Sequence, residues 1–142
     1  MITALLFATV AHASTTMSVP AASAAIVDGD CARTTGFVTT DGGDCSMEFP
    51  VSLPSGTVIS AITVEYYDTG SCSVAGSLMK YGLTAYGETT VNSFMSAGSS
   101  ANLRNGTLTG VTTSNSFNYG VRVDLNFSAS SQCGVRGLTF AY

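Results

Sequence analysis

Histidine and the common catalytic motifs are nearly absent from this sequence. Its 142 residues include a single histidine, His12, which lies within the first 13 residues. Histidine is a frequent general base and metal ligand, so removal of those residues would exclude histidine-based triads and histidine metal sites. The sequence also has no G-x-S-x-G, P-loop or G-x-G-x-x-G motif. We therefore predict a protein that is not an enzyme, with no catalytic residues and no cofactor.

Positive charge is also scarce, and the formal net charge is −4. Nucleic acids and anionic membranes are bound through clustered cations. The five cationic residues of this chain are scattered: Arg33, Lys80, Arg104, Arg122 and Arg136. The sequence therefore predicts neither nucleic acid nor an anionic membrane surface as a partner.

Long apolar runs are missing, apart from a short one at the N-terminus. Residues 2–11 are mostly apolar and lead into Ala11-His12-Ala13, a pattern typical of a signal-peptide cleavage site. The run is shorter than the ~20 residues that span a membrane, and no lysine or arginine precedes it. We predict a secreted, extracellular protein without a membrane span. Residues 1–13 are either a signal peptide or part of a retained apolar segment.

Four cysteines are present, and none forms a C-x-x-C pair. Metal sites usually draw their cysteines from such close pairs, whereas an even number of cysteines in an exported chain indicates disulfides. We favour Cys31–Cys45, which closes a short loop, and Cys72–Cys133, which ties a loop to the start of the last strand. The other two pairings and four reduced, buried thiols are the alternatives.

Alternation of apolar and polar residues is typical of β-strands, because successive side chains point to opposite faces. It is clearest in residues 58–66, 79–85 and 121–127. The apolar faces of these segments and of the last strand are Val58, Ile62, Val64 and Tyr66; Met79, Tyr81, Leu83 and Ala85; Val121, Val123, Leu125 and Phe127; and Leu138, Phe140 and Tyr142. About eight to ten short strands predict an all-β fold, an antiparallel β-sandwich that is jelly-roll-like or Ig-like.

The dipeptide Asn105-Gly106 favours a type I′ turn, because both central residues of that turn need a positive φ. We therefore expect a hairpin of strands 100–104 and 107–112. Asn105-Gly106-Thr107 and Asn126-Phe127-Ser128 also match the glycosylation pattern, which makes Asn105 and Asn126 candidate sites in a host that glycosylates. Such triplets also arise by chance in a chain rich in serine and threonine.

Acidic residues flank the Cys31–Cys45 loop and are candidate calcium ligands. Calcium binds six to eight oxygen atoms, and carboxylates gather in two short stretches here, although their spacing matches no EF-hand. The alternative is that Asp and Gly only form turns. The candidates are Asp28, Asp30, Asp41 and Asp44; no other metal site is predicted.

Exposed aromatic side chains could bind sugars. Tyr67 is expected on the outer face of its strand, and Tyr86 and Phe94 are further candidates for a glycan-binding row. The alternative is that these rings pack against other parts of the protein. A glycosidase would need two carboxylates at one site; Glu48, Glu65, Asp68, Glu88 and Asp124 are the acidic residues considered, and we expect Glu65 and Asp124 to be solvated surface charges.

The stretch VSLPSGTVISAITVEYYD, residues 51–68, has a Leu-Pro-x-Gly turn followed by a strand that ends in Tyr-Asp, and the chain closes on GVRGLTFAY. These features resemble uncharacterised secreted bacterial β-sandwich proteins. The resemblance covers about half of the chain. It implies an exported β-sandwich, and it implies no activity.

The sequence leads to one functional hypothesis and one alternative. Only 10% of the residues are charged, so little repulsion keeps copies of the chain apart. We predict a subunit of an extracellular filament or surface assembly, made of one sandwich domain at residues 28–142 and an apolar arm at residues 1–27 that adds a strand to a neighbouring copy. The arm's assembly residues would be Ile2, Leu5, Leu6, Phe7 and Val10. The alternative is a carbohydrate-binding or surface-binding module.

Overall fold

The structure of this protein is a computed structural model that describes residues 15–83, 87–96, 100–127 and 131–142. These residues form nine β-strands and one 3-10 helix, η1 (Ala21–Ser23). The strands are β1 (Thr16–Pro20), β2 (Ala25–Thr34), β3 (Phe37–Val51), β4 (Ala61–Asp68), β5 (Ser73–Gly82), β6 (Glu88–Met95), β7 (Ser100–Thr109), β8 (Phe117–Asn126) and β9 (Cys133–Ala141). The all-β prediction is confirmed.

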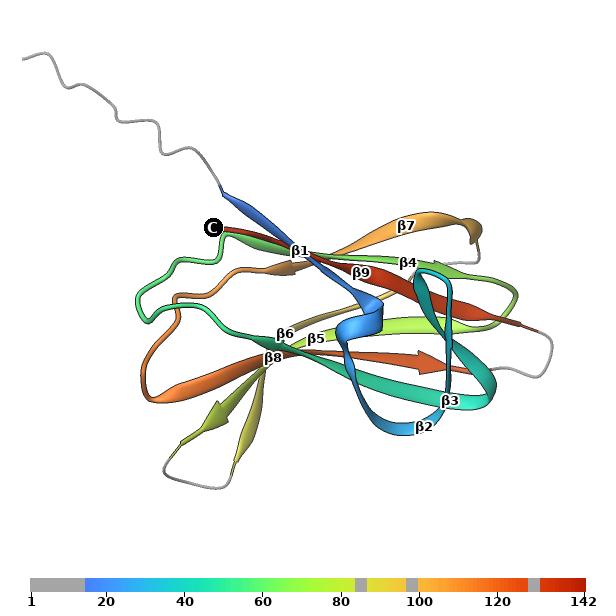
Figure 1. The fold of residues 1–142 in the computed structure, drawn as a ribbon, viewed down its shortest axis with the longest axis horizontal. Helices are drawn as coiled ribbons and strands as arrows, with labels where there is room; N and C mark the ends of the chain where they lie inside the picture. Colours follow the sequence, from blue (N-terminus) through green and yellow to red (C-terminus); the bar gives the residue numbers. More distant parts are fainter. Residues whose placement is uncertain (1–14, 84–86, 97–99, 128–130) are drawn as a thin grey trace, which may run out of the picture.

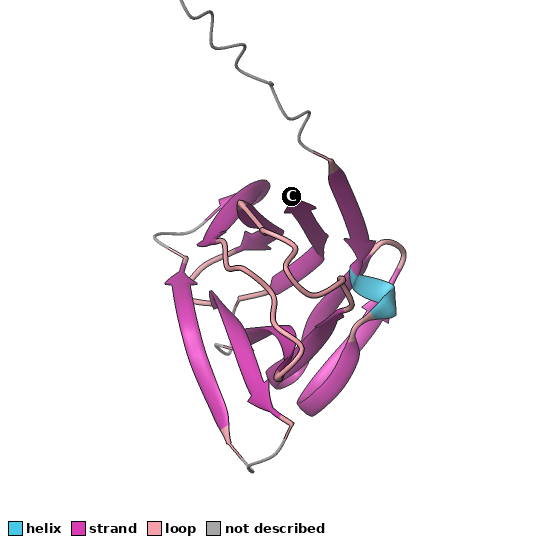
Figure 2. Ribbon diagram, turned by 90° about the vertical axis from the view of Figure 1, so that its left-hand side faces the viewer, coloured by secondary structure: helices cyan, strands magenta, loops and turns pink. Residues whose placement is uncertain are grey.

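The strands form two layers that pack face to face (Figures 1 and 2). Layer 1 has the order β6-β5-β8-β3-β2, and layer 2 has the order β7-β4-β9-β1. All of these pairs are antiparallel, as predicted. Strand β3 connects the layers, because its residues 45–51 pair with β8 whereas Val38 and Thr39 pair with β9. The result is a nearly closed antiparallel β-sandwich.

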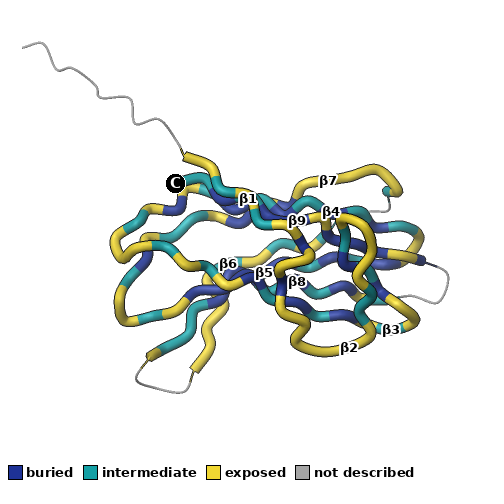
Figure 3. The backbone as a smooth tube through the Cα atoms, in the orientation of Figure 1, coloured by how far each residue is buried: buried dark blue, intermediate teal, exposed yellow. Residues whose placement is uncertain are grey.

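The core lies between the layers and is built from alternate residues of the long strands. In β8, Val121, Val123 and Leu125 are fully buried, as the alternation predicts. Ile62 and Val64 of β4 are fully buried as well. Each such side chain contributes roughly 1.5–3 kcal/mol of burial free energy. The exposed segments lie mainly along β2, β6 and β7, which are at the borders of the layers (Figure 3).

Two of the predicted apolar faces differ from the structure at their ends. Val58 makes only an isolated bridge with Thr112 and is 61% exposed, because β4 begins at Ala61. In β5, the core side is taken by Val74 and Leu78, which are fully buried.

The alternation that begins at Met79 therefore marks the outer face of layer 1. Tyr81 lies opposite Asn118 of β8 and is half-buried, and Leu83 is exposed. Ala85 lies outside the described residues.

The predicted hairpin at Asn105-Gly106 is wrong. Strand β7 runs straight through this dipeptide, with Asn105 paired to Glu65 and Gly106 paired to Val64. Gly106 is not among the glycines with a positive φ. Its role is close packing: a Cβ atom there would lie 2.2 Å from the Phe94 ring. Glycine inside a strand often marks such an approach rather than a turn.

Both favoured disulfides are confirmed. Cys31–Cys45 joins β2 to β3 with a Cα–Cα distance of 5.0 Å, and Cys72–Cys133 joins the start of β5 to the start of β9 with a Cα–Cα distance of 5.8 Å. The second disulfide therefore ties layer 1 to layer 2. The described residues include no free cysteine.

Residues 16–27 belong to the sandwich, which corrects the expected boundary between an arm at residues 1–27 and a domain at residues 28–142. Strand β1 pairs with β9, and Ala21 and Ala24 are buried in the core. The predicted assembly residues Ile2, Leu5, Leu6, Phe7 and Val10 lie outside the described residues. Among the residues that the structure describes, none forms a helix of the length and apolarity that a membrane crossing requires.

Candidate functional site

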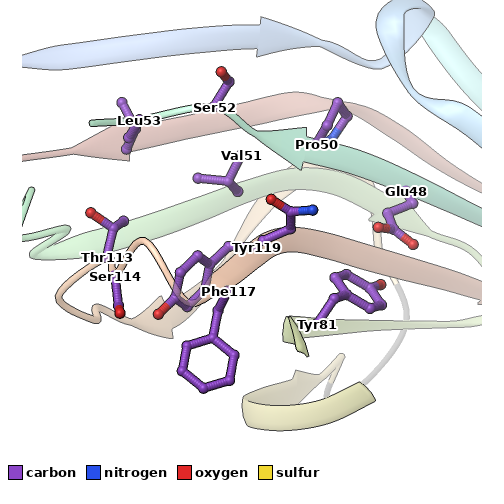
Figure 4. A pocket seen from close by; sticks show the side chains of 11 residues that line it. Glu48, Pro50, Val51, Ser52, Leu53, Tyr81, Thr113, Ser114, Phe117 and Tyr119 are labelled. Atoms are coloured by element: carbon purple, nitrogen blue, oxygen red, sulfur yellow. The ribbon is translucent and has the colours of Figure 1, made fainter. Parts of the chain in front are cut away.

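A groove of about 520 Å³ opens at one end of layer 1. Strand β3 contributes Glu48, Pro50 and Val51, and residues 52 and 53 follow directly after it. Strand β5 contributes Tyr81, and β8 contributes residues 117–119. Thr113 and Ser114, which precede β8, complete its lining. Figure 4 shows how these side chains lie. The groove exists because β3, β8 and β5 are neighbours in the sheet although they are far apart in the sequence.

One side of the groove is aromatic. The rings of Phe117 and Tyr119 lie edge to face with their centroids 6.5 Å apart, and Figure 4 shows them next to each other. The ammonium group of Lys80 lies 3.7 Å from the centroid of the Phe117 ring. Tyr119 is buried and Phe117 is half-buried. Aromatic rings offer a broad apolar surface with specific geometry. Phe117, whose ring has Lys80 over one face, is the more exposed of the two.

The other side of the groove is polar. Glu48 and Tyr81 lie next to each other there, and both side chains point into the same space (Figure 4). Burial of Tyr81, followed by the nearby Glu48 carboxylate, raises the pKa of its hydroxyl to about 12. The hydroxyl therefore keeps its proton at neutral pH. A phenol hydroxyl beside a carboxyl group provides both a donor and acceptors for hydrogen bonds.

A second acidic residue and one arginine extend this polar side across the outer face of layer 1. The guanidinium Nη2 of Arg122 lies 3.3 Å from Glu88 Oε2 and 3.7 Å from Glu48 Oε2. Arg122 thus forms ion pairs with two glutamates. The cluster of Arg122, Glu48 and Glu88 has a formal charge of −1. The buried Nε atom of Arg122 makes no hydrogen bond to a described residue. The buried hydroxyl of Tyr81 lies close enough to Glu48 for the carboxylate to raise its pKa.

The structure does not bring together Tyr67 and Phe94, the two described residues among the three predicted to bind glycans. The Tyr67 ring lies on β4 in layer 2 and packs edge to face against Phe37, with centroids 5.5 Å apart. Phe94 stacks on Tyr66 with centroids 5.8 Å apart, and it also faces Gly76 and Gly106, so it packs between the layers. Tyr86 lies outside the described residues. A shared row of Tyr67 and Phe94 is therefore excluded.

The calcium candidates do not form one cluster either. Asp28 accepts a hydrogen bond from the backbone N–H of Gly29, and Asp44 accepts one from the backbone N–H of Phe127. Within residues 15–142, apart from the three undescribed loops, no three His, Cys, Asp or Glu side chains are close enough to hold a metal ion. Asp28 lies within β2, at a register shift in its pairing with β3, and not in a turn. The four candidate residues therefore form no metal-binding group in the part of the chain that the structure describes.

The candidate glycosylation sites are accessible. Asn105 is exposed on β7, which is the last strand of layer 2. Asn126 is exposed at the end of β8, where its side-chain amide donates a hydrogen bond to the hydroxyl of Ser73. Glycosylation of both residues stays a prediction.

Local sequence patterns do not reveal the groove, because its residues come from three separate segments. By its alternation Tyr81 belongs to an apolar strand face, and no pattern marks Phe117 or Tyr119 as binding residues. One usable signal was present: Tyr81 and Leu83 continue an apolar alternation on a face that is not the core. A second signal is the pair of aromatic residues in SFNYG, residues 116–120, at the start of a strand.

No known protein family matches the sequence, and no curated protein matches it. Several solved structures have a similar fold. The CBM36-1 domain of a multidomain xylanase from the hindgut metagenome of Trinervitermes trinervoides has a TM-score of 0.58 at 15% identity, over 89% of this chain and 96% of that one. A CBM36 carbohydrate-binding module in complex with calcium and xylotriose has a TM-score of 0.56 at 14% identity, over 89% and 99%. TmCBM61 in complex with β-1,4-galactotriose has a TM-score of 0.54 at 10% identity, over 89% and 86%.

At these identities the similarity shows a shared fold. The chain is an all-β, two-disulfide sandwich of the kind found in carbohydrate-binding modules. None of these neighbours is described as a subunit of a filament, so the comparisons give no support to the predicted filament subunit. The β-sandwich fold that the resemblance to secreted bacterial proteins implied is confirmed. No family model matches the sequence.

Proposed function

We propose that this protein is a non-enzymatic carbohydrate-binding module and that the groove is its binding site. The observation that carries this proposal is that two aromatic residues, Phe117 and Tyr119, line the same groove as two hydrogen-bonding residues, Glu48 and Tyr81. A sugar ring has apolar C–H faces and a rim of hydroxyl groups. An aromatic surface next to hydrogen-bonding side chains is complementary to both parts of it.

The dimensions and the fold support the same function. A groove of about 520 Å³ is within the usual range of small-ligand sites, roughly 300–1,000 Å³. Proteins that share this fold have been solved with xylotriose and with galactotriose. Two disulfides are typical of proteins that work in oxidising surroundings such as the extracellular space, where polysaccharides are found.

The groove is better suited to binding a glycan than to hydrolysing a glycosidic bond. Glycosidases place two carboxyl groups on either side of the scissile bond. Glu48 is the one carboxylate among the described residues that line the groove, and Glu88 lies on the far side of Arg122 from it in the strand order. Glu65 is paired with Arg136 on layer 2, and Asp68 is buried in the core side of β4. We therefore assign recognition, not bond cleavage, to this site.

Calorimetric titration with xylotriose, cellotriose and β-1,4-galactotriose tests the proposal. We expect at least one of these to bind, and we expect Phe117→Ala to weaken binding by about tenfold or more, since central aromatic contacts often carry over 1 kcal/mol. Tyr67→Ala is the matched control, because Tyr67 is also a half-buried ring in an edge-to-face pair but lies on layer 2. Its affinity should equal that of the unmodified protein.

Two results would overturn this assignment. One is a folded protein that binds none of the three oligosaccharides. The other is loss of binding in Tyr67→Ala with full binding in Phe117→Ala, which would move the site to layer 2. Circular dichroism and thermal unfolding of each variant separate a lost contact from a lost fold.

A further inference from the structure

We infer that the groove selects neutral glycans and rejects acidic ones such as uronates. This inference rests on the proposed function and adds the class of ligand. Its basis is the set of charges around the groove. Among the described residues that line it, Glu48 is acidic and no residue is basic.

The nearest cations are Arg122 and Lys80. Arg122 is shared between Glu88 at 3.3 Å and Glu48 at 3.7 Å, so its charge is more than balanced by the two carboxylates. The ammonium of Lys80 lies over the Phe117 ring, 3.7 Å from its centroid, and on β5 it points to the face opposite that of its neighbour Tyr81. A uronate carboxylate beside Glu48 and Tyr81 would therefore meet the Glu48 carboxylate, and the cation on that face is Arg122, whose charge is already balanced.

The hydrogen-bonding groups point to the same class of ligand. An ionised carboxylate only accepts hydrogen bonds, so Glu48 needs donors from the ligand, and the hydroxyl groups of a neutral sugar are donors. A ligand carboxylate offers Glu48 only further acceptors. Such a mismatch leaves groups unpaired and adds like-charge repulsion, which is how binding sites discriminate against a competing ligand.

The protein as a whole reinforces this preference. Its formal net charge is −4, and Glu88 and Asp124 also lie on the outer face of layer 1 near Arg122. Neutral glycans are insensitive to that field, whereas acidic glycans are repelled by it at low ionic strength.

The test compares two oligosaccharides that differ only at C6: cellotriose and its C6-oxidised, glucuronate form, in which carboxylates replace hydroxymethyl groups, with galactotriose and its oxidised form as a second pair. We expect the neutral member to bind at least about tenfold more tightly. Added salt should reduce the ratio of the affinities for the neutral and the acidic oligosaccharide, because it screens the repulsion between the acidic ligand and the protein. Glu48→Gln should narrow it as well, by strengthening binding of the acidic member. Glu65→Gln is the control, since Glu65 is a carboxylate paired with Arg136 on layer 2, and it should leave the ratio unchanged.

The outcomes separate the two proposals. If neither member of either pair binds, the proposed function itself fails. If both members bind equally, or the acidic one binds more tightly, the selectivity is wrong although the groove binds glycans. If the neutral member is preferred but Glu48→Gln leaves the ratio unchanged, Glu48 is not its source. The salt series on the unmodified protein gives an answer even if Glu48→Gln does not fold.

Discussion

The Glu48 carboxylate lies directly against the backbone of Gly120. A Cβ atom at Gly120 would come within 2.5 Å of Glu48 Oε1, closer than van der Waals contact allows. Gly120 is the residue of β8 that pairs with Pro50 of β3, and so it sits between the groove and the Arg122 cluster. The absence of a side chain at this one position lets Glu48 extend over β8 toward Tyr81.

This relationship makes Gly120→Ala a specific probe of the groove. The new methyl group should displace the Glu48 carboxylate, which is the flexible end of its side chain, so we expect the fold to lose less than about 1 kcal/mol. Oligosaccharide affinity measured by calorimetry should fall several-fold. Gly43→Ala is the matched control, because a Cβ there would lie 2.5 Å from a carboxylate oxygen of Asp30, away from the groove. Equal affinities of the two variants would contradict the role of Glu48.

The packing of Phe94 predicts that Gly106→Ala destabilises the protein. The ring is stacked on Tyr66 and a Cβ at Gly106 would lie 2.2 Å from it, so a rigid group would have to move. Overpacking of this kind costs about 1–3 kcal/mol, which urea unfolding can measure. For comparison, Gly87→Ala meets nothing within 4 Å and should change the free energy of unfolding by less than about 0.5 kcal/mol. A Gly106→Ala variant as stable as Gly87→Ala would show that the ring is not held in place.

The two disulfides should contribute unequally to stability. Cys72–Cys133 spans a sequence separation of 61 residues and Cys31–Cys45 one of 14. Loop-closure entropy assigns about 4 kcal/mol to the first and about 3 kcal/mol to the second. Replacing each pair by alanine and measuring guanidinium unfolding should therefore show the larger loss for Cys72–Cys133. An equal loss, or a larger one for Cys31–Cys45, would mean that restriction of the unfolded chain does not set the difference.

The hydroxyl of Tyr81 should lose its proton at a higher pH than an ordinary tyrosine does. Its pKa is raised from 10.0 to about 12, so the folded protein holds this proton more tightly than the unfolded chain does. The associated stabilisation is complete below pH 10 and is lost as the pH rises from 10 through 12. In a pH titration, the tyrosinate absorbance should rise in a step near pH 12. Tyr81→Phe should remove this step, and it should also remove the loss of folding stability that accompanies it.

The same titration tests the partner of Tyr81. Glu48→Gln should move the Tyr81 titration step to lower pH, because the Glu48 carboxylate contributes to the raised pKa of Tyr81. In Tyr67, burial alone raises the pKa, so Glu48→Gln should leave the Tyr67 step where it is. A Tyr81 step that does not respond to Glu48→Gln would place the carboxylate too far away to act.

Local patterns predicted the fold better than the site. The alternation of Val121, Val123 and Leu125 marks a strand with one buried face wherever it lies, because the side-chain period is set by the backbone. At Gly106 the local pattern misled, since Asn-Gly favours a turn in isolation, but the pairing of β7 with β4 and the Phe94 ring keep this stretch extended. Here tertiary packing outweighed local preference.

The sequence by itself determined the all-β class, the antiparallel sandwich and the shortage of histidine and positive charge, and it favoured the two disulfide pairings that the structure contains. Each of these follows from residue type or from a period along the chain. Only the tertiary structure decided which face of β5 carries Tyr81 and that Glu48, Tyr81 and Phe117 line one groove. The physical reason is the strand order: β3, β8 and β5 lie side by side through long-range pairing, which no local period encodes.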